Sequence, residues 1–448
     1  MKPLTLDAIR DGLEGDVPPT LATCAPDGTP NGAYLSQVEY VDPDHVALSW
    51  QFFNKTRQNS LANPVACLNS VDSRTIARHR LVIRYLRTET SGPLFERMKA
   101  KLAGIASHTG MSGVFKLQGS DVYRVESIER LPGPVLPAPP ESRNLLAAVR
   151  ACATKIGSIG ELQALLDAAL ECIVANFSIE HALVLMLDRA QERLYTVASR
   201  GYPDSGVGSE IPFGQGVVGV AARERTPIRI GFAQAEYAYG RAIREAALRE
   251  GLSLETEIPL PGLGDSRSQL AVPIEGFGRV LGVLFVEAAQ DRRFGYDDED
   301  ALVAVAGQLG SAIHVLQASP DSDEAPAAAT DSTPAATSGP PLAVRHFAEN
   351  DSVFLGGDYL IKGVAGSIFH ALVADFLATG RTEFSNRELR LDPRVKLPDL
   401  SDNLEARLIL LARRLAERDA GIRIEKAGRG RLRLAVSRPL ELVQVAAP

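Results

Sequence analysis

Two segments that cannot form regular structure divide this chain of 448 residues into three blocks. Leu131–Pro140 contains five prolines in ten residues, which exclude a continuous helix or a central strand and predict a semi-rigid spacer. Ala318–Pro341 consists mainly of Ala, Pro, Ser, Thr and Asp without a large apolar side chain, so we expect it to be disordered. The predicted units are therefore residues 1–131, 141–317 and 342–448, with a disordered linker at 318–341.

The composition indicates a soluble globular protein, since 45% of the residues are hydrophobic and 23% are charged. A net charge of −7 argues against nucleic-acid binding over the whole chain but allows one basic module. No apolar run reaches the length of a membrane span, and the first residues lack the apolar core of a signal peptide. Neither the four cysteines nor the seven histidines show metal-binding spacing. We therefore expect a cytoplasmic protein with reduced thiols and no metal.

A polar stretch in the first block has residue types suited to binding phosphate. Gln51–Pro64 lies between two apolar, strand-like runs and is predicted to be a loop. It carries Lys55, Thr56 and Arg57 in succession, with amide side chains on both sides. Two cations and a hydroxyl group at this spacing can bind a phosphate monoester. A solvated basic loop is the alternative.

A turn and a strand precede this stretch. The sequence DGTPN at Asp27–Asn31 favours a turn. The residues after it favour a strand, in which Tyr34, Ser36, Val38 and Tyr40 would share one face. A second turn is expected at residues 42–44, so strands and turns alternate up to the polar stretch.

This order of elements resembles the FMN-binding split barrel of the pyridoxamine phosphate oxidase superfamily, over about residues 5–131. The resemblance implies that FMN phosphate binds at the polar stretch and that the strand around residues 34–37 lies along the isoalloxazine and ribityl groups. The cofactor-binding residues that it implies are Tyr34, Ser36, Gln37, Asn54, Lys55, Thr56 and Arg57. Such barrels are usually dimers.

One position departs from the oxidases. They carry an arginine early in that strand, where this chain has Ala33. Flavin binding is therefore better supported than oxidation of pyridoxamine phosphate, and a barrel that has lost its flavin is the alternative. In split barrels late loops reach the flavin ring, and His108 lies in such a segment.

The middle block alternates helical and strand-like periods. Apolar residues form a helical stripe in Leu162–Phe177, and strands are predicted at residues 182–187, 193–199, 268–274 and 280–287. A long helix is expected at Tyr296–Gln317. Between them, FGQGVVG lacks the Lys-Ser/Thr pair of a P-loop, so its glycines are expected to serve packing. This order resembles a GAF domain, which implies a small effector of unknown identity and a homodimer.

The last block predicts three helices, at residues 363–379, 386–391 and 402–418, and then a basic hairpin at 422–436. Its end resembles the winged helix of response-regulator effector domains. The segment between Ser401 and Arg438 contains ten cationic and five acidic residues, and this excess of positive charge favours binding to a phosphate backbone. The resemblance implies phosphate contacts by residues of the third helix and the wing. These residues are Arg407, Arg414, Arg429 and Arg431.

Four consecutive apolar residues, Leu408–Leu411, interrupt that interpretation. If Leu408 and Leu411 face the core, Ile409 and Leu410 lie outside it. An apolar outer face suits a partner protein or a neighbouring domain better than DNA. A winged helix that only binds proteins is therefore the alternative to a DNA-binding one.

The predicted fold class is multidomain: a split β-barrel, an α/β GAF domain and an α+β winged helix. The combination resembles a bacterial cytoplasmic signalling protein that binds FMN, senses a small effector and acts through DNA or a partner. The alternatives are a flavin-dependent oxidoreductase with regulatory domains, and a scaffold without ligands. The sequence identifies no catalytic residue.

Overall fold

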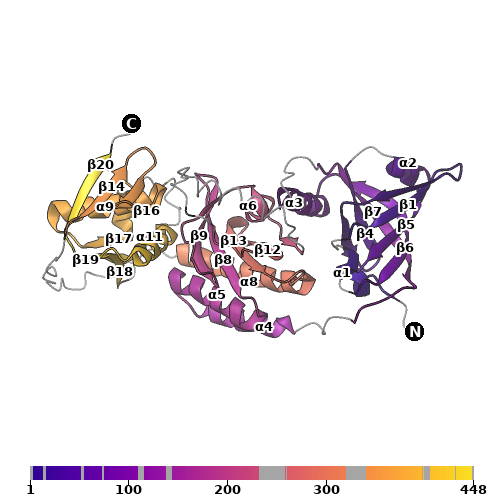
Figure 1. The fold of residues 1–448 in the computed structure, drawn as a ribbon, viewed down its shortest axis with the longest axis horizontal. Coiled ribbons are helices and arrows are strands. Elements are labelled where there is room, and N and C mark those ends of the chain that lie inside the picture. Colours follow the sequence, from indigo (N-terminus) through magenta and orange to yellow (C-terminus); the bar gives the residue numbers. More distant parts are fainter. Residues whose placement is uncertain are drawn as a thin grey trace.

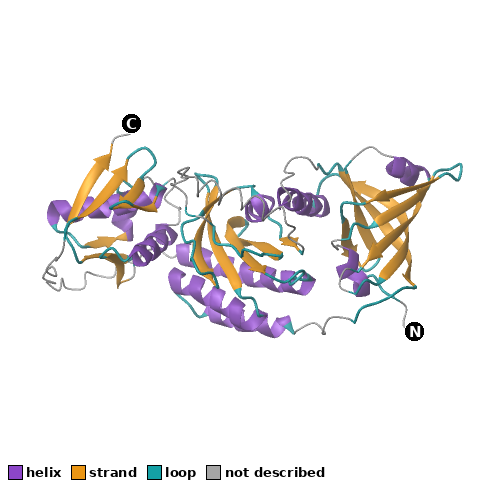
Figure 2. Cartoon of the chain, viewed as in Figure 1, coloured by secondary structure: helices purple, strands orange, loops and turns teal. Residues whose placement is uncertain are grey.

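The computed structural model describes most of the chain as three units arranged in a row (Figure 1). The described residues are 4–13, 17–51, 55–72, 75–108, 116–137, 144–231, 258, 260–318, 340–395, 397, 404–428 and 430–445. Sheets form the centre of each unit, and helices cover them or lie between units (Figure 2). Residues 131–137 of the first expected spacer are described, whereas most of the second, 318–341, falls outside these ranges. No helix in the described ranges combines the length and apolarity that a membrane crossing requires.

The N-terminal unit is built on a seven-stranded antiparallel sheet, in the order β2-β1-β5-β6-β7-β4-β3. Its strands are β1 Thr20–Cys24, β2 Pro30–Tyr34, β3 Val38–Asp42, β4 His45–Trp50, β5 Val65–Val71, β6 Arg78–Glu89 and β7 Gly119–Leu131. Its helices are η1 Asp7–Ile9, α1 Arg10–Leu13, α2 Lys55–Ala62 and α3 Pro93–His108. Inward-facing residues such as Leu68, Leu81 and Tyr123 form its core.

The polar stretch after β4 is wrongly predicted as a loop, because Lys55–Ala62 form helix α2. Its sequence contains good helix formers, and tertiary contacts hold it. Asn59 is buried and donates to Thr23 Oγ1 at 3.2 Å, and the Ser60 hydroxyl donates to the Thr56 carbonyl at 3.1 Å. On a helix, Lys55, Thr56 and Arg57 point in different directions, so they cannot all surround one anion as the loop prediction implied.

The strand expected to continue through Tyr34, Ser36 and Val38 is also interrupted. β2 ends at Tyr34, β3 begins at Val38, and the two form opposite edges of the sheet. Tyr34 and Ser36 are exposed, whereas Val38 is buried. The prediction of one shared face was therefore wrong, because the chain crosses from one edge to the other between these residues.

The middle unit has a six-stranded antiparallel sheet, in the order β10-β9-β8-β13-β12-β11. The strands are β8 His181–Asp188, β9 Arg193–Arg200, β10 Glu210–Pro212, β11 Ile228–Ile230, β12 Ser268–Gly276 and β13 Arg279–Ala288. Helices α4 Leu145–Gly157, α5 Leu162–Phe177 and α8 Tyr296–Ala318 cover one face. Helix α6 Gly216–Glu224 lies on the other (Figure 1). The predicted elements are confirmed, and α4, β10 and β11 are additions.

The C-terminal unit contains two small sheets and three helices. One sheet has the order β16-β15-β14-β20, and the other has the order β17-β19-β18. The strands are β14 Leu342–Phe347, β15 Ser352–Leu355, β16 Asp358–Ile361, β17 Glu383–Ser385, β18 Ile422–Gly428, β19 Arg431–Val436 and β20 Leu440–Val445. The helices are α9 Gly363–Thr379, α10 Asn386–Leu391 and α11 Leu404–Arg418. The order of three helices followed by a hairpin is confirmed.

Local signals in this unit have mixed outcomes. Ser385, followed three residues later by Glu388, has the sequence pattern of a capping box. The structure contains this box at the start of α10, because the Ser385 hydroxyl accepts from the Glu388 amide at 3.2 Å while the Glu388 carboxylate accepts from the Ser385 amide at 3.0 Å. The sequence of Leu355–Leu360 favours one short strand, but the structure divides these residues between β15 and β16. Gly356 has φ +64° and turns the chain between β15 and β16.

Candidate functional site

A cavity of about 130 Å³ in the N-terminal unit brings together several residues implied to bind flavin. Its lining includes Tyr34, Ser36, Thr56 and Arg57. Gln37 is buried and does not line the cavity. Tyr34, at the end of β2, is 80% exposed. The cavity therefore joins the end of β2 to the first turn of α2, which are more than 20 residues apart in sequence.

Arg57 is held by other side chains around this cavity. Its Nη1 atom lies 2.5 and 2.6 Å from the two carboxylate oxygens of Asp121, and its Nη2 atom donates to Thr88 Oγ1 at 3.1 Å. The guanidinium also lies 3.7 Å from the centre of the Trp50 ring. A phosphate would have to compete with Asp121 for this cation, so charge pairing weakens the case for Arg57 as a phosphate ligand.

The other residues implied to bind phosphate differ in exposure. Thr56 is buried, and its Oγ1 accepts from Asn31 Nδ2 at 2.9 Å. Lys55 is exposed at the first residue of α2, where the helix dipole and the ammonium group both favour an anion. Asn54 lies outside the described residues, as do the side chain of His108 and the residues that follow it.

A buried phenol forms part of the cavity wall. Tyr123 on β7 lies in the core, and burial strongly raises the pKa of its hydroxyl. Near neutral pH the group is therefore an uncharged hydrogen-bonding hydroxyl. Together with Trp50 it gives the cavity an aromatic character that suits a planar ring.

A second candidate site lies where α11 meets the middle unit. Arg407 on α11 donates through Nη2 to Asp188 Oδ2 at 2.5 Å, and both side chains are only 7% exposed. The guanidinium lies 4.2 Å from the centre of the Tyr195 ring on β9. Asp188 also accepts from the backbone amides of Ala190 and Gln191, each at 3.0 Å. The expected DNA-contacting Arg407 is therefore buried between two units.

Further polar contacts extend this interface along α11 and beyond it. Arg413 donates to the Val197 carbonyl at 2.7 Å and to Asp167 Oδ1 at 2.8 Å. Three more pairs join the units: Lys426 with Glu161 at 2.9 Å, Lys362 with Glu210 at 3.3 Å, and Ser205 with Glu417. Ion pairs and hydrogen bonds thus surround the central buried pair.

The apolar side chains of α11 complete the contact. Ile409 and Leu410 are buried in a core that includes residues of both units. A carbon placed on Gly208 of the middle unit would lie 3.6 Å from Leu410 Cδ1. In this arrangement the outer apolar residues face a neighbouring domain, which was one of the two alternatives to DNA.

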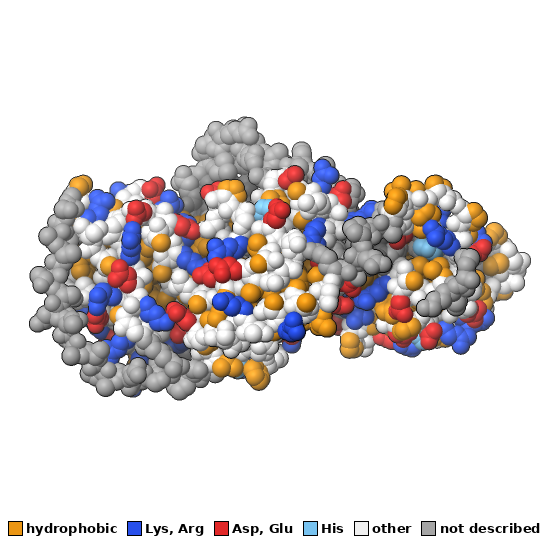
Figure 3. Space-filling view, turned by 90° about the horizontal axis from the view of Figure 1, so that it is seen from below, with side chains coloured by type: hydrophobic (Ala, Val, Ile, Leu, Met, Phe, Trp, Pro, Cys, Tyr) orange, Lys and Arg blue, Asp and Glu red, His pale blue; other side chains and the backbone are white. Residues whose placement is uncertain are grey.

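Of the other arginines implied to contact DNA, those within the described residues do not pair with the GAF domain as Arg407 does. Arg414 is buried, and both of the following hydrogen bonds lie within its own unit: it donates to the Leu360 carbonyl at 3.2 Å and to Glu417 Oε2 at 2.6 Å. Arg431 is exposed on β19, and Arg429 lies outside the described residues. On the face seen in Figure 3, acids and cations are interspersed. The implied set therefore does not form one basic surface in this arrangement.

The N-terminal unit meets the middle unit through α3, which contacts α6 and β11. Ala100 of α3 is fully buried among residues of α6. Arg10 lies over the Tyr296 ring at 3.7 Å, and Arg229 is 4.5 Å from the same ring. The middle sheet thus contacts one flanking unit on each side.

The glycines before and within α6 serve packing, as expected. A Cβ atom on Gly219 would overlap the Pro212 carbonyl oxygen, and Gly214 adopts φ +81°. The Gly219 carbonyl instead accepts from the Gly214 amide at 2.9 Å. This close approach of backbone to backbone explains the glycines without a phosphate ligand.

Comparison with known proteins names the middle unit. The family model described as "GAF domain" matches residues 161–314. This segment is a GAF domain. No curated protein matches the chain in sequence.

Solved structures resemble separate parts of the chain at low identity. The GAF domain of an Acinetobacter phosphoenolpyruvate-protein phosphotransferase is 23% identical and covers 39% of this chain and 95% of its own, with a TM-score of 0.31. Free methionine-R-sulfoxide reductase from Neisseria meningitidis, in complex with its substrate, is 18% identical over 40% of this chain and 94% of its own (TM-score 0.31). An FMN-binding protein from Syntrophomonas wolfei is 17% identical over 29% and 86%, respectively (TM-score 0.25).

The acidic partners at both sites were not predicted from the sequence. Asp121 engages Arg57, and Asp188 engages Arg407, across 64 and 219 residues of sequence. Asp121 lies near the start of β7 and Asp188 at the end of β8, and both are buried. A carboxylate on a buried strand is costly without a partner, and that signal could have drawn attention to them.

Proposed function

We propose that this protein is a sensory regulator whose GAF domain holds a winged-helix-like C-terminal unit in a docked state. The observation that carries the proposal is the buried ion pair between Arg407 of α11 and Asp188 of β8. A charge pair removed from water is sensitive to small changes of geometry, so it can respond to an effector bound elsewhere in the GAF domain. Release of α11 would be the output.

The order of elements in the C-terminal unit supports a DNA-binding output. Three helices precede a two-stranded hairpin, and α11 has the position of a recognition helix. Such a helix must enter the major groove, but the GAF domain covers the side of α11 that carries Arg407. DNA binding through this face therefore requires undocking. A protein partner for the released apolar face of Ile409 and Leu410 is the alternative.

We further propose that the N-terminal unit is a flavin-type split barrel that binds FMN. The cavity lined by Tyr34, Trp50 and Tyr123 supports this, since it offers aromatic side chains to a planar ring. Its volume of about 130 Å³ suits only part of an isoalloxazine, so the rest of the cofactor would lie along the exposed Tyr34. Lys55 at the start of α2 would hold the phosphate, with Arg57 retained by Asp121.

FMN, when bound, would supply redox chemistry, and the protein would supply binding and access. This leaves a flavin-dependent oxidoreductase as the second candidate function. The one carboxylate among the described residues of the cavity, Asp121, is already paired with Arg57. A sensory role needs no further proton donor and is therefore preferred. We also expect a cytoplasmic homodimer, which light scattering of the purified protein would test.

An absorbance spectrum of the purified chain tests flavin binding directly. We expect the bands of oxidised flavin and release of FMN on denaturation. Lys55→Ala should lower FMN retention at least tenfold because it removes the exposed cation at the start of α2, whereas Lys116→Ala, at an exposed lysine outside the cavity, should not. A colourless protein that also fails to take up added FMN would overturn the flavin proposal and leave the docking proposal intact.

A further inference from the structure

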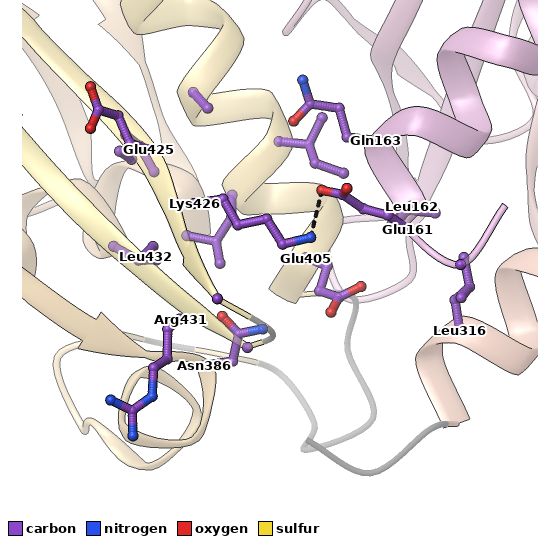
Figure 4. Close-up of a pocket in the computed structure, with 17 residues that line it drawn as sticks. Glu161, Leu162, Gln163, Leu316, Asn386, Glu405, Glu425, Lys426, Arg431 and Leu432 are labelled. Atoms are coloured by element: carbon purple, nitrogen blue, oxygen red, sulfur yellow. Dashed lines mark ion pairs between the residues drawn. The ribbon is translucent and has the colours of Figure 1, made fainter. Parts of the chain in front are cut away.

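A pocket of about 160 Å³ lies in the seam between the GAF domain and the C-terminal unit (Figure 4). The GAF domain contributes the start of α5 and the end of α8. The C-terminal unit contributes α11, β18, β19 and Asn386 at the start of α10. We call it the seam pocket. Its position matters because anything bound there contacts both sides of the docked interface.

Apolar side chains form much of the seam pocket. They are Leu162, Leu316, Leu408, Ile409, Ala412, Ile424 and Leu432. A cavity of about 150 Å³ lined by such residues is large enough for benzene. The volume therefore limits the apolar part of a ligand to about the size of one six-membered ring.

The charged groups at the pocket are largely satisfied by one another. Lys426 and Glu161 form an ion pair at 2.9 Å, and the Glu405 carboxylate also lies on the Lys426 side of the pocket (Figure 4). Arg431 extends away from this cluster (Figure 4). A charged ligand would have to break or crowd the existing pair and lose its own hydration. These charges therefore favour an uncharged ligand.

One buried amide gives the pocket a polar recognition point. Asn386 is 5% exposed and lines the pocket, and within the described residues its side-chain amide has no hydrogen-bond partner. A side-chain amide both donates and accepts, so a carboxamide can pair with it through two hydrogen bonds. The amide atoms of Asn386 are not among the fully buried side-chain atoms without a partner, so they are not left desolvated, and a ligand carboxamide in the pocket would pair with them.

We propose that the seam pocket binds a small uncharged ring compound that carries a carboxamide, for which benzamide is the simplest probe. The ring would fill the apolar part between Leu408, Ala412 and Leu432, and the carboxamide would pair with Asn386. Because the walls come from both units, such a ligand stabilises the docked arrangement. That last consequence depends on the regulatory role proposed above, whereas binding itself does not.

The test measures binding of three probes to the full chain by ligand-observed NMR and calorimetry. Benzamide, benzoate and benzylamine share one ring and differ in the charge of the polar group. We expect benzamide to bind with a dissociation constant at least tenfold below those of the other two. Equal binding of all three probes, tighter binding of a charged probe, or no binding of benzamide at millimolar concentration would overturn the proposal.

Two variants locate the binding. Ala412→Phe fills the pocket and should weaken benzamide binding at least tenfold, whereas Ala416→Phe, one turn later on the exposed side of α11, should leave it unchanged. Asn386→Leu keeps the size of the side chain and should remove the preference for benzamide over the other probes. Benzamide binding that survives both pocket variants lies elsewhere and refutes the assignment. Thermal unfolding of each variant identifies any loss caused by misfolding.

Discussion

Replacing Asp188 by Asn should release α11 from the GAF domain. The substitution removes the carboxylate charge that faces Arg407 at 2.5 Å, and it leaves the guanidinium buried beside Tyr195. The Asn side chain keeps one oxygen that can accept from the amides of Ala190 and Gln191, so the turn after β8 retains its hydrogen bonds. The perturbation therefore acts on the docked interface more than on the GAF fold.

The size of the effect follows from the burial of the pair. Breaking a buried ion pair by removing one partner costs about 3–5 kcal/mol. At about 1.4 kcal/mol for each factor of ten, a loss of about 3 kcal/mol shifts the docking equilibrium roughly 100-fold toward the released state. If only the released state binds DNA, the apparent affinity rises by the same factor until release is complete.

Fluorescence anisotropy with duplex DNA at several salt concentrations measures this shift. We expect the Asp188→Asn chain to bind more tightly than the parent, with affinity that falls as salt rises because phosphate contacts release counterions. Glu171→Gln is the matched control, since Glu171 forms an exposed ion pair with Arg200 at 2.7 Å within the GAF domain. Its DNA affinity should equal that of the parent.

Small-angle scattering measures whether the variant is more extended than the parent, and so tells two negative results apart. A variant that expands but shows no gain in DNA binding would refute DNA as the output and favour a protein partner. A variant that stays as compact as the parent would refute the claim that the Arg407–Asp188 pair holds the interface. Thermal unfolding confirms in both cases that the variant is folded.

The GAF domain itself allows two further checks. Gly219→Ala should lower the free energy of unfolding by about 1–3 kcal/mol, because its Cβ atom would overlap the Pro212 carbonyl oxygen. Gly307→Ala, at an open position of α8, should raise it by up to about 1 kcal/mol. A denaturant titration compares the two variants, and equal effects would contradict the packing role of Gly219. Burial, with a smaller contribution from Cys172, raises the pKa of the Cys152 thiol from 9.0 to about 12. The stabilising contribution of the neutral thiol should be complete below pH 9 and be lost as the pH rises toward 12. In unfolding experiments at stepwise pH, Cys152→Ala should therefore lose less stability over this range than the parent. Rapid reaction of Cys152 in the native protein with a thiol reagent at pH 8 would contradict its burial.

Much of the secondary structure followed from local pattern. The apolar stripe of Leu162–Phe177, the capping box at Ser385 and the alternating runs of the GAF sheet each carry their signal within a few residues. Helix α2 was missed because its polar sequence has no apolar stripe, and contacts such as that of Asn59 with Thr23 select the helical form. β14 and β20 were missed because they pair in parallel across almost 100 residues.

The sequence by itself determined three blocks, the GAF resemblance of the middle one and the excess of arginine near the end. It could not determine which acids those arginines meet, because an ion pair between residues 188 and 407 leaves no periodic trace in either segment. Only the tertiary structure decided that Arg57 is paired with Asp121 and that α11 is docked on the GAF domain. The physical reason is that charge pairing and burial depend on distance in space, whereas sequence patterns report distance along the chain.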